Sequence, residues 1–176
     1  MVSMIADLLA GWGFWSLAHN LGHRWWHVEM RTGKNTPYAH GEREHHRVYD
    51  IHGIQDFRHA EDPRELFISF PFFAVAPIGL LFVAAYGWLR GWEHCLPFAA
   101  AMYLCMIADH RLHILFHKSA KLPGPLGRLQ QMHLMHHQTH RHNYFFVTGI
   151  VWDVLFGTAR TEPEPANLQV TSDTTV

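Results

Sequence analysis

The sequence lacks the features of several common protein classes. Its 14 Lys and Arg residues are matched by 15 Asp and Glu residues, so the strongly basic surface of a general nucleic-acid-binding protein is absent and we expect no nucleic-acid partner. There are only two cysteines, Cys95 and Cys105, and they form no CxxC motif. Both lie in or beside an apolar run, which favours neither a disulfide framework nor a thiolate metal site.

Signatures of nucleotide binding, zinc hydrolysis and secretion are absent as well. The chain has no glycine-rich nucleotide-binding fingerprint and no HExxH motif. Residues 1–18 lack the basic start and small-residue cleavage site of a signal peptide. Nothing suggests two domains, so we predict one domain over residues 1–160. Residues 161–176 are polar and contain proline, which predicts a disordered tail.

Charge is missing from two long segments. Residues 66–89 hold neither a charged residue nor a histidine, and as a helix they would be about 36 Å long, enough to cross a bilayer with some tilt. Residues 95–108 are a second uncharged run, which becomes long enough if the helix continues to His117. Residues 1–18 are a weaker third candidate, which either spans the membrane or lies at its surface.

The positive-inside rule orients these segments. If residues 66–89 and 95–112 form an out-and-back hairpin, the external turn contains Arg90 as its only Lys or Arg. The other basic residues lie on the histidine side or, for Arg111, at the helix end. We therefore predict an all-α fold, an integral membrane helical hairpin with a cytoplasmic histidine-rich helical cap and a cytoplasmic C-terminus. Two buried helices of a soluble protein are the less favoured alternative.

What the sequence has in abundance is histidine, with 17 residues in 176. Imidazole is the commonest metal ligand in proteins. The histidines cluster in HNLGH at 19–23, EREHH at 42–46, HRLHILFH at 110–117 and HLMHH at 133–137. Histidines spaced i, i+4 share a helix face and can bind one ion, whereas adjacent histidines diverge by about 100° and suit two different centres. The spacing thus predicts a pair of metals without distinguishing Fe, Zn, Cu or Ni.

These motifs resemble those of the fatty acid hydroxylase and sterol desaturase superfamily, which are integral-membrane non-haem di-iron oxidases. The resemblance extends from residue 19 to residue 158. Its most specific part follows the last histidine cluster, where Asn143 and Tyr144 precede a W-D-x-x-F-G-T segment at 152–158.

The resemblance implies a set of metal ligands, with one position open. The implied ligands are His19, His23, His45, His46, His113, His117, His133, His136 and His137. The first position of the second histidine box is Glu42 here, so either Glu42 or the nearby His40 is the tenth ligand. Five residues are candidates for supporting the ligands from a second layer: His110, His140, His142, Asn143 and Asp153. The scattered His27, His52, His59 and His94 are interpreted as hydrogen-bonded surface groups rather than ligands.

The activity implied by the resemblance is O2-dependent hydroxylation of an unactivated C–H bond in a lipid-like substrate, with two iron ions (Fe2+/Fe3+) as cofactor and O2 as co-substrate. Desaturation of a lipid or sterol is the alternative on the same scaffold. Electrons would come from a separate donor such as a ferredoxin or a cytochrome b5-like protein, and membrane lipid would surround the helices. Five aromatic residues either line an apolar path for the substrate or contact lipid at the interface: Trp12, Trp15, Phe70, Phe72 and Phe73.

Two other function classes use similar residues. A metal transporter places ionisable groups within its membrane helices, but residues 66–89 and 95–108 contain none. A zinc-dependent membrane hydrolase needs a carboxylate base near its ligands, and Glu44 beside His45 keeps this alternative open.

Overall fold

The computed structural model describes residues 2–34, 36–51, 72–118, 121–144 and 147–161. These ranges are helical and contain no strand, which confirms the predicted all-α class for this part of the chain. The elements are α1 (Val2–Arg31), α2 (Pro37–Ile51), α4 (Phe72–Arg90), η1 (Trp92–His94), α5 (Cys95–Lys118), α6 (Gly124–Thr139), η2 (Val147–Gly149) and α7 (Ile150–Leu155).

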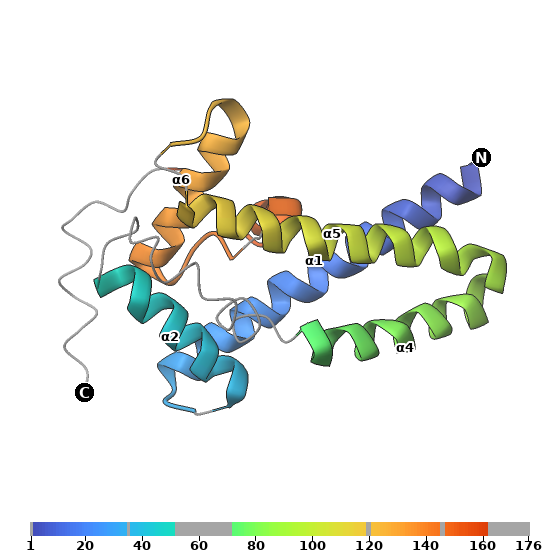
Figure 1. The fold of residues 1–176 in the computed structure, drawn as a ribbon, viewed down its shortest axis with the longest axis horizontal. Helices are drawn as coiled ribbons and strands as arrows, with labels where there is room; N and C mark the ends of the chain where they lie inside the picture. The colour runs from blue at the N-terminus through green and yellow to red at the C-terminus, as the bar shows by residue number, and fades with distance from the viewer. Residues whose placement is uncertain (1, 35, 52–71, 119–120, 145–146, 162–176) are drawn as a thin grey trace.

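The helices form an elongated bundle with two different ends (Figure 1). Helices α1 and α5 run along most of its length and pack mainly against each other, and α4 is joined to α5 by the short turn η1. The predicted hairpin is therefore present. Helix α5 also continues without a break from its apolar half to His117, as the sequence predicts. Helices α2 and α6 gather at the end far from the N-terminus.

A glycine lets α1 and α5 approach closely. A Cβ atom on Gly11 would lie 2.2 Å from the carbonyl oxygen of Phe98, so a larger residue would push the helices apart.

Helix α1 ends in a Schellman motif, in which the amide of Gly33 donates to the carbonyl of Met30 and that of Lys34 donates to the carbonyl of Glu29. Gly33 has a φ of 71°, which glycine adopts at little cost. The Thr32-Gly33 pair, whose glycine predicts a turn from the sequence, forms a turn in the structure.

Residues 121–127 are rich in proline and glycine, a composition that predicts a turn, but only their first three residues precede helix α6. Helix α6 already begins at Gly124, and Gly127 is a buried helical residue. Pro125 lies in the first helical turn, where proline is well tolerated because its missing N–H has no helical acceptor. Gly127 is needed for packing, since a Cβ there would lie 2.0 Å from the carbonyl oxygen of Leu122.

The interior is divided into an apolar part and a polar part. The apolar part lies between α1, α4 and α5, and its buried centre is Trp15, Phe98, Met102 and Met106. The polar part lies where α1, α2, α5 and α6 meet, and histidine is the most frequent of its buried residues. Burying this many imidazoles is costly unless they have polar or metal partners.

A carboxylate fixes the hairpin to α1 at the end that bears the N-terminus. Asp7 is fully buried and accepts a hydrogen bond of 2.6 Å from the Tyr86 hydroxyl. Its other oxygen lies 2.7 Å from Nδ1 of His94. His94 is thus engaged in a structural contact, in agreement with its interpretation as a hydrogen-bonded group.

No helix in the described ranges has both the length and the apolarity needed to cross a membrane. The predicted span 66–89 lies only partly within these ranges, because the described part of α4 begins at Phe72. His52, His59, Phe70 and the tail from residue 162 lie outside the described residues. The membrane hairpin stays a prediction.

Candidate metal centre

Ten side chains form two compact groups at the α2 and α6 end of the bundle. Within each group, one ligand atom per residue can be chosen so that all five lie within 4.8 Å of one another. The all-histidine group is His45, His113, His117, His133 and His137. The carboxylate group is His23, His27, Glu42, His46 and His136.

The two groups have the same construction. Each contains two i, i+4 pairs, whose members stand one turn apart on one helix face. The all-histidine group takes one pair from α5 (113 and 117) and one from α6 (133 and 137). The carboxylate group takes one pair from α1 (23 and 27) and one from α2 (42 and 46).

Two adjacent histidine pairs complete and connect the groups. His45 belongs to the all-histidine group and His46 to the carboxylate group, and His137 and His136 divide in the same way. The ring centroids of His46 and His137 are 4.4 Å apart, so the groups are immediate neighbours. The prediction that adjacent histidines serve different centres agrees with this arrangement.

In the all-histidine group, four ring nitrogens converge on one point. Nε2 of His117 lies 3.0 Å from Nε2 of both His113 and His133, and Nε2 of His133 lies 3.3 Å from Nε2 of His137. An imidazole nitrogen has either one hydrogen or one lone pair, so it cannot make two linear hydrogen bonds at once. A cation between the rings would satisfy all the nitrogens together.

In the carboxylate group, Glu42 lies among three rings. Its Oε1 atom is 2.9 Å from Nε2 of His23, 3.3 Å from Nε2 of His46 and 3.5 Å from Nε2 of His27. Nε2 of His23 and Nε2 of His27 are 3.1 Å apart. Oxygen and nitrogen donors are thus directed at one position.

These separations fit the coordination shell of a transition metal. Ligand atoms about 2.1 Å from one ion are about 3.0 Å apart at a right angle and about 3.4 Å apart at a tetrahedral angle. The short contacts in both groups, from 2.9 to 3.5 Å, cover this range. A shell of nitrogens and one carboxylate suits iron, zinc, copper or nickel and does not by itself choose among them.

Backbone carbonyls orient two rings of the carboxylate group. Nδ1 of His136 donates to the carbonyl of His142 over 2.7 Å, and Nδ1 of His23 donates to that of Tyr144 over 3.0 Å. Because a carbonyl can only accept, Nδ1 carries the ring hydrogen and Nε2 presents its lone pair to the group. Nε2 of His136 is buried and has no hydrogen-bond partner among the described residues. A bound ion would supply that partner.

Burial lowers the pKa of several of these imidazoles and so favours the neutral form that metal binding requires. Desolvation lowers the pKa of His27 to about 4 and the pKa of His45 to about 3. Burial is the main cause that holds the pKa of His133, His136 and His137 well below the usual range, and electrostatic repulsion from neighbouring imidazoles is the second. These rings bind no proton at neutral pH, so their lone pairs are available.

Glu42 remains ionised despite its surroundings. Burial alone would raise its pKa, but the neighbouring His23 and the close side-chain contacts with His23, His27 and His46 hold the pKa well below its usual range. A metal cation in this position would act on the carboxylate in the same direction.

Two predicted second-layer residues fix the turn that follows α6. The side-chain oxygen of Asn143 accepts a hydrogen bond of 2.7 Å from the Arg160 amide, and its side-chain nitrogen donates one of 2.9 Å to the carbonyl of Met132. Asp153 accepts from the Tyr144 amide at 3.1 Å and from the Asn20 side chain at 2.9 Å. The turn carries the carbonyls that orient His23 and His136, so both residues support the group through the backbone.

The remaining second-layer candidates differ from one another. His142 contributes its carbonyl to His136. His140 packs its ring 4.3 Å from that of His46. His110 is half-buried on α5 and belongs to neither group.

A glutamine holds α6 against α5. The Gln130 side chain is buried. It donates a hydrogen bond of 2.9 Å to the carbonyl of Phe116 and accepts one of 2.9 Å from the amide of Leu122. This clamp connects the end of α5, the connecting turn and α6. It therefore fixes the relative positions of the two pairs that make up most of the all-histidine group.

Two predicted ligand positions are not in either group. His19 is buried beside Asp109, with its Nδ1 atom 3.9 Å from Oδ2 of that residue. His40 is exposed, because it lies six positions before His46 and so points about 120° away from it around α2. Glu42, four positions before His46, shares its face. The structure thus brings Glu42 rather than His40 to the site.

His27 takes the position expected for His19, and its interpretation as a surface group is wrong. It is fully buried within the carboxylate group. The sequence contains a usable signal, since His19, His23 and His27 form two consecutive i, i+4 steps on α1. Which step reaches the site depends on where α1 crosses α2 and α6.

Comparison of the chain with protein-family models, curated proteins and solved structures gives no match.

Proposed function

We propose that this protein is a membrane-bound, O2-dependent oxidase that hydroxylates or desaturates an unactivated C–H bond of a lipid-like substrate at two neighbouring iron ions. The observation that carries the proposal is the pair of buried five-residue groups, each made of two i, i+4 pairs and connected through adjacent histidines. When bound, two iron ions would supply the activation of O2 and the redox chemistry that no amino-acid side chain provides.

The residues of this chain have three tasks in such a reaction. The all-histidine and carboxylate groups would each hold one ion through the ligand atoms of five residues. The carbonyls of His142 and Tyr144 aim the rings of His136 and His23. Burial of the rings excludes water and so protects the site from side reactions.

Support for a membrane location comes from the outer surface of the apolar half. Leu81 and Trp88 on α4 are 71% and 82% exposed, and Leu104 on α5 is 65% exposed. Apolar side chains directed outward from several helices are typical of contact with lipid or another apolar surface. The cytoplasmic orientation and the separate electron donor are part of the proposal.

Metal analysis combined with O2 uptake tests the proposal. The full chain, purified in detergent, should contain about two irons per molecule and consume O2 only when a reductant is supplied. His117→Ala and His136→Ala should each abolish turnover while leaving membrane insertion intact, and His40→Ala is the matched control with full activity. Full activity in either ligand variant would refute the assignment.

Two results would favour the other function classes. Zinc in the site together with ester or amide hydrolysis would identify a hydrolase. Cation flux across proteoliposomes without turnover would identify a transporter. Product analysis by mass spectrometry after expression with candidate lipids separates hydroxylation from desaturation.

A further inference from the structure

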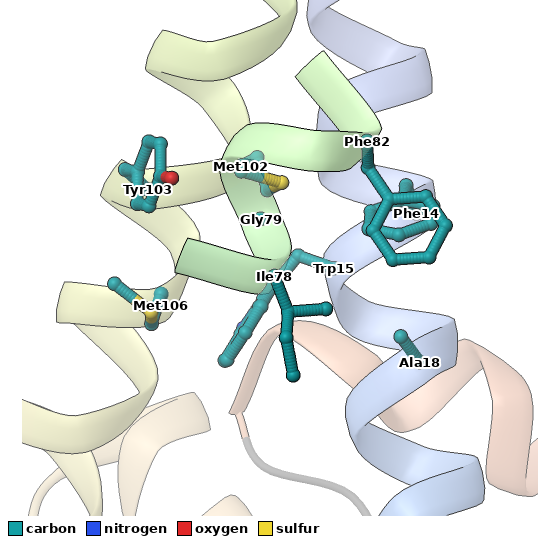
Figure 2. Close-up of a pocket in the computed structure, with 9 residues that line it drawn as sticks. All are labelled: Phe14, Trp15, Ala18, Ile78, Gly79, Phe82, Met102, Tyr103 and Met106. Carbon is teal, nitrogen blue, oxygen red and sulfur yellow. The ribbon is translucent and has the colours of Figure 1, made fainter. Parts of the chain in front are cut away.

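An apolar pocket between α1, α4 and α5 lies outside the metal centre. Figure 2 shows its lining, with side chains from all three helices around one space. The lining residues are Phe14, Trp15, Ala18, Ile78, Gly79, Phe82, Met102, Tyr103 and Met106. The empty volume is about 390 Å³, which includes space open to solvent at the mouth.

The chemistry of the lining favours a hydrocarbon ligand. None of the lining residues carries a charge, and the indole nitrogen of Trp15 is already hydrogen-bonded to Asp109 over 2.9 Å. A polar group placed here would lose its water without adequate compensation. Met102 and Met106 have flexible thioether side chains that adapt to the shape of an alkyl chain.

One end of the pocket points toward the metal centre. Ala18 precedes His23 by five residues on α1, and Met106 precedes His113 by seven on α5. At the helical rise of about 1.5 Å per residue, these steps are about 8 Å and about 10 Å along the bundle. The ring of His19 lies between Trp15 and His23 on α1. Its centroid is 5.2 Å from that of the Trp15 ring, on which it stacks, and 6.5 Å from that of the His23 ring.

Gly79 leaves the middle of the pocket wall without a side chain (Figure 2). A Cβ atom on Gly79 would lie 2.9 Å from the Tyr103 hydroxyl oxygen and 3.0 Å from the terminal methyl of Met102. Both contacts are with the ends of side chains, so a small substituent would be accommodated by loss of pocket space. A larger side chain here would fill part of the pocket between α4 and α5.

We propose that this pocket binds the end of an unbranched alkyl chain of the substrate and that the absence of a side chain at Gly79 lets the chain enter. The inference rests on the proposed function and adds a consequence for regiochemistry. The pocket ends about 8 to 10 Å before the metal groups along the helices. The reacting carbon is therefore an internal carbon, separated from the buried terminal methyl group.

Photocrosslinking tests this inference without requiring turnover. The probe is hexadecanol with a diazirine on its terminal carbon, added to the full chain in detergent micelles, and the labelled residues are identified by mass spectrometry. We expect labelling of the α5 segment that contains Met102, Tyr103 and Met106. Unlabelled hexadecanol should compete for the site, and a steroid alcohol should compete more weakly.

Matched variants of α4 test the role of Gly79. Gly79→Leu should weaken labelling by roughly tenfold or more, the range in which apolar pockets discriminate small changes in ligand size. Ala85→Leu adds the same bulk at an exposed position of α4 outside the pocket and should leave labelling unchanged. Thermal unfolding checks that each variant is folded.

A third variant is available if Gly79→Leu fails to fold. Phe82 lines the far end of the pocket and is 45% exposed, so Phe82→Ala should extend the pocket with little cost to folding. Octadecanol should then gain as a competitor relative to hexadecanol. An unchanged order of competitors would overturn the inference.

Three further results would also overturn it. The first is unchanged labelling in a folded Gly79→Leu protein, and the second is stronger competition by the steroid alcohol. The third is equal labelling by phosphatidylcholine with the same diazirine on an acyl chain, since this would identify a structural lipid. Iron content and O2 uptake are measured on the same samples, so loss of the proposed function without loss of Gly79-dependent labelling is recognised separately.

Discussion

The all-histidine group and the carboxylate group are built alike and differ in charge. Both combine two i, i+4 pairs with one member of an adjacent histidine pair. Only the carboxylate group contains an anionic residue, Glu42, so an ion there would experience one additional negative charge. A carboxylate favours the harder and more oxidised form of a metal. We therefore expect two inequivalent ions, with the one beside Glu42 more tightly bound when oxidised.

The groups also differ in how their rings are supported. In the carboxylate group, the turn after α6 supplies carbonyls to His23 and His136. In the all-histidine group, the two main pairs are held in position by the clamp that Gln130 makes between α5 and α6. The first kind of support orients individual rings, whereas the second fixes whole helices. Variants can separate these effects.

The largest expected effect comes from replacing either of two adjacent histidines by alanine. His136→Ala should lose the ion of the carboxylate group, and His137→Ala should lose that of the all-histidine group, because the two residues serve different groups. Each variant should retain about one metal per chain and have no O2 uptake. Metal analysis gives the metal content of each variant, and electron paramagnetic resonance characterises the ion that remains. Identical spectra for the two variants would contradict the two-group arrangement.

The second prediction concerns the charge of Glu42. Glu42→Gln keeps an oxygen atom but removes the charge, so the affinity of one ion should fall by at least roughly tenfold while the other ion is retained. Competitive chelator titration measures both affinities. His40→Ala, on the same helix but exposed, is the control. Equal weakening of both sites would show that Glu42 does not distinguish the groups.

The third prediction compares His27 with His19. His27→Ala should reduce the metal content of the carboxylate group, because its Nε2 lies 3.1 Å from Nε2 of His23. His19→Ala should retain two metals, since His19 is in neither group. Metal analysis of the two purified variants tests this difference. If His19→Ala lost metal and His27→Ala did not, the ligand pair on α1 would be His19 and His23, as the sequence motif suggests.

The smallest expected effect comes from the turn after α6. Asp153→Asn weakens the bonds that hold Tyr144 and Asn20, so the free energy of unfolding should fall by roughly 1–3 kcal/mol. Metal affinity should fall more in the carboxylate group than in the all-histidine group, because only the former has rings shown to be oriented by this turn. Thermal unfolding and chelator titration measure the two effects. A uniform loss of affinity would assign Asp153 a purely structural role.

The sequence by itself determined the helical class, the hairpin of α4 and α5, the i, i+4 pairs and the division of adjacent histidines. These features follow from helix geometry, since residues four apart share a face and adjacent residues do not. Spacing also contained the answer for Glu42, which shares a helix face with His46 whereas His40 does not.

Only the tertiary structure decided that α1 uses His23 and His27 instead of His19 and His23. All three residues lie close to one stripe of α1, so local geometry permits either pair. The choice depends on how far α1 extends past α2 and α6, and packing at Gly11 and the apolar core sets that position. Contacts between distant segments are not encoded in any local spacing, which is why the pair could be identified only in the folded chain.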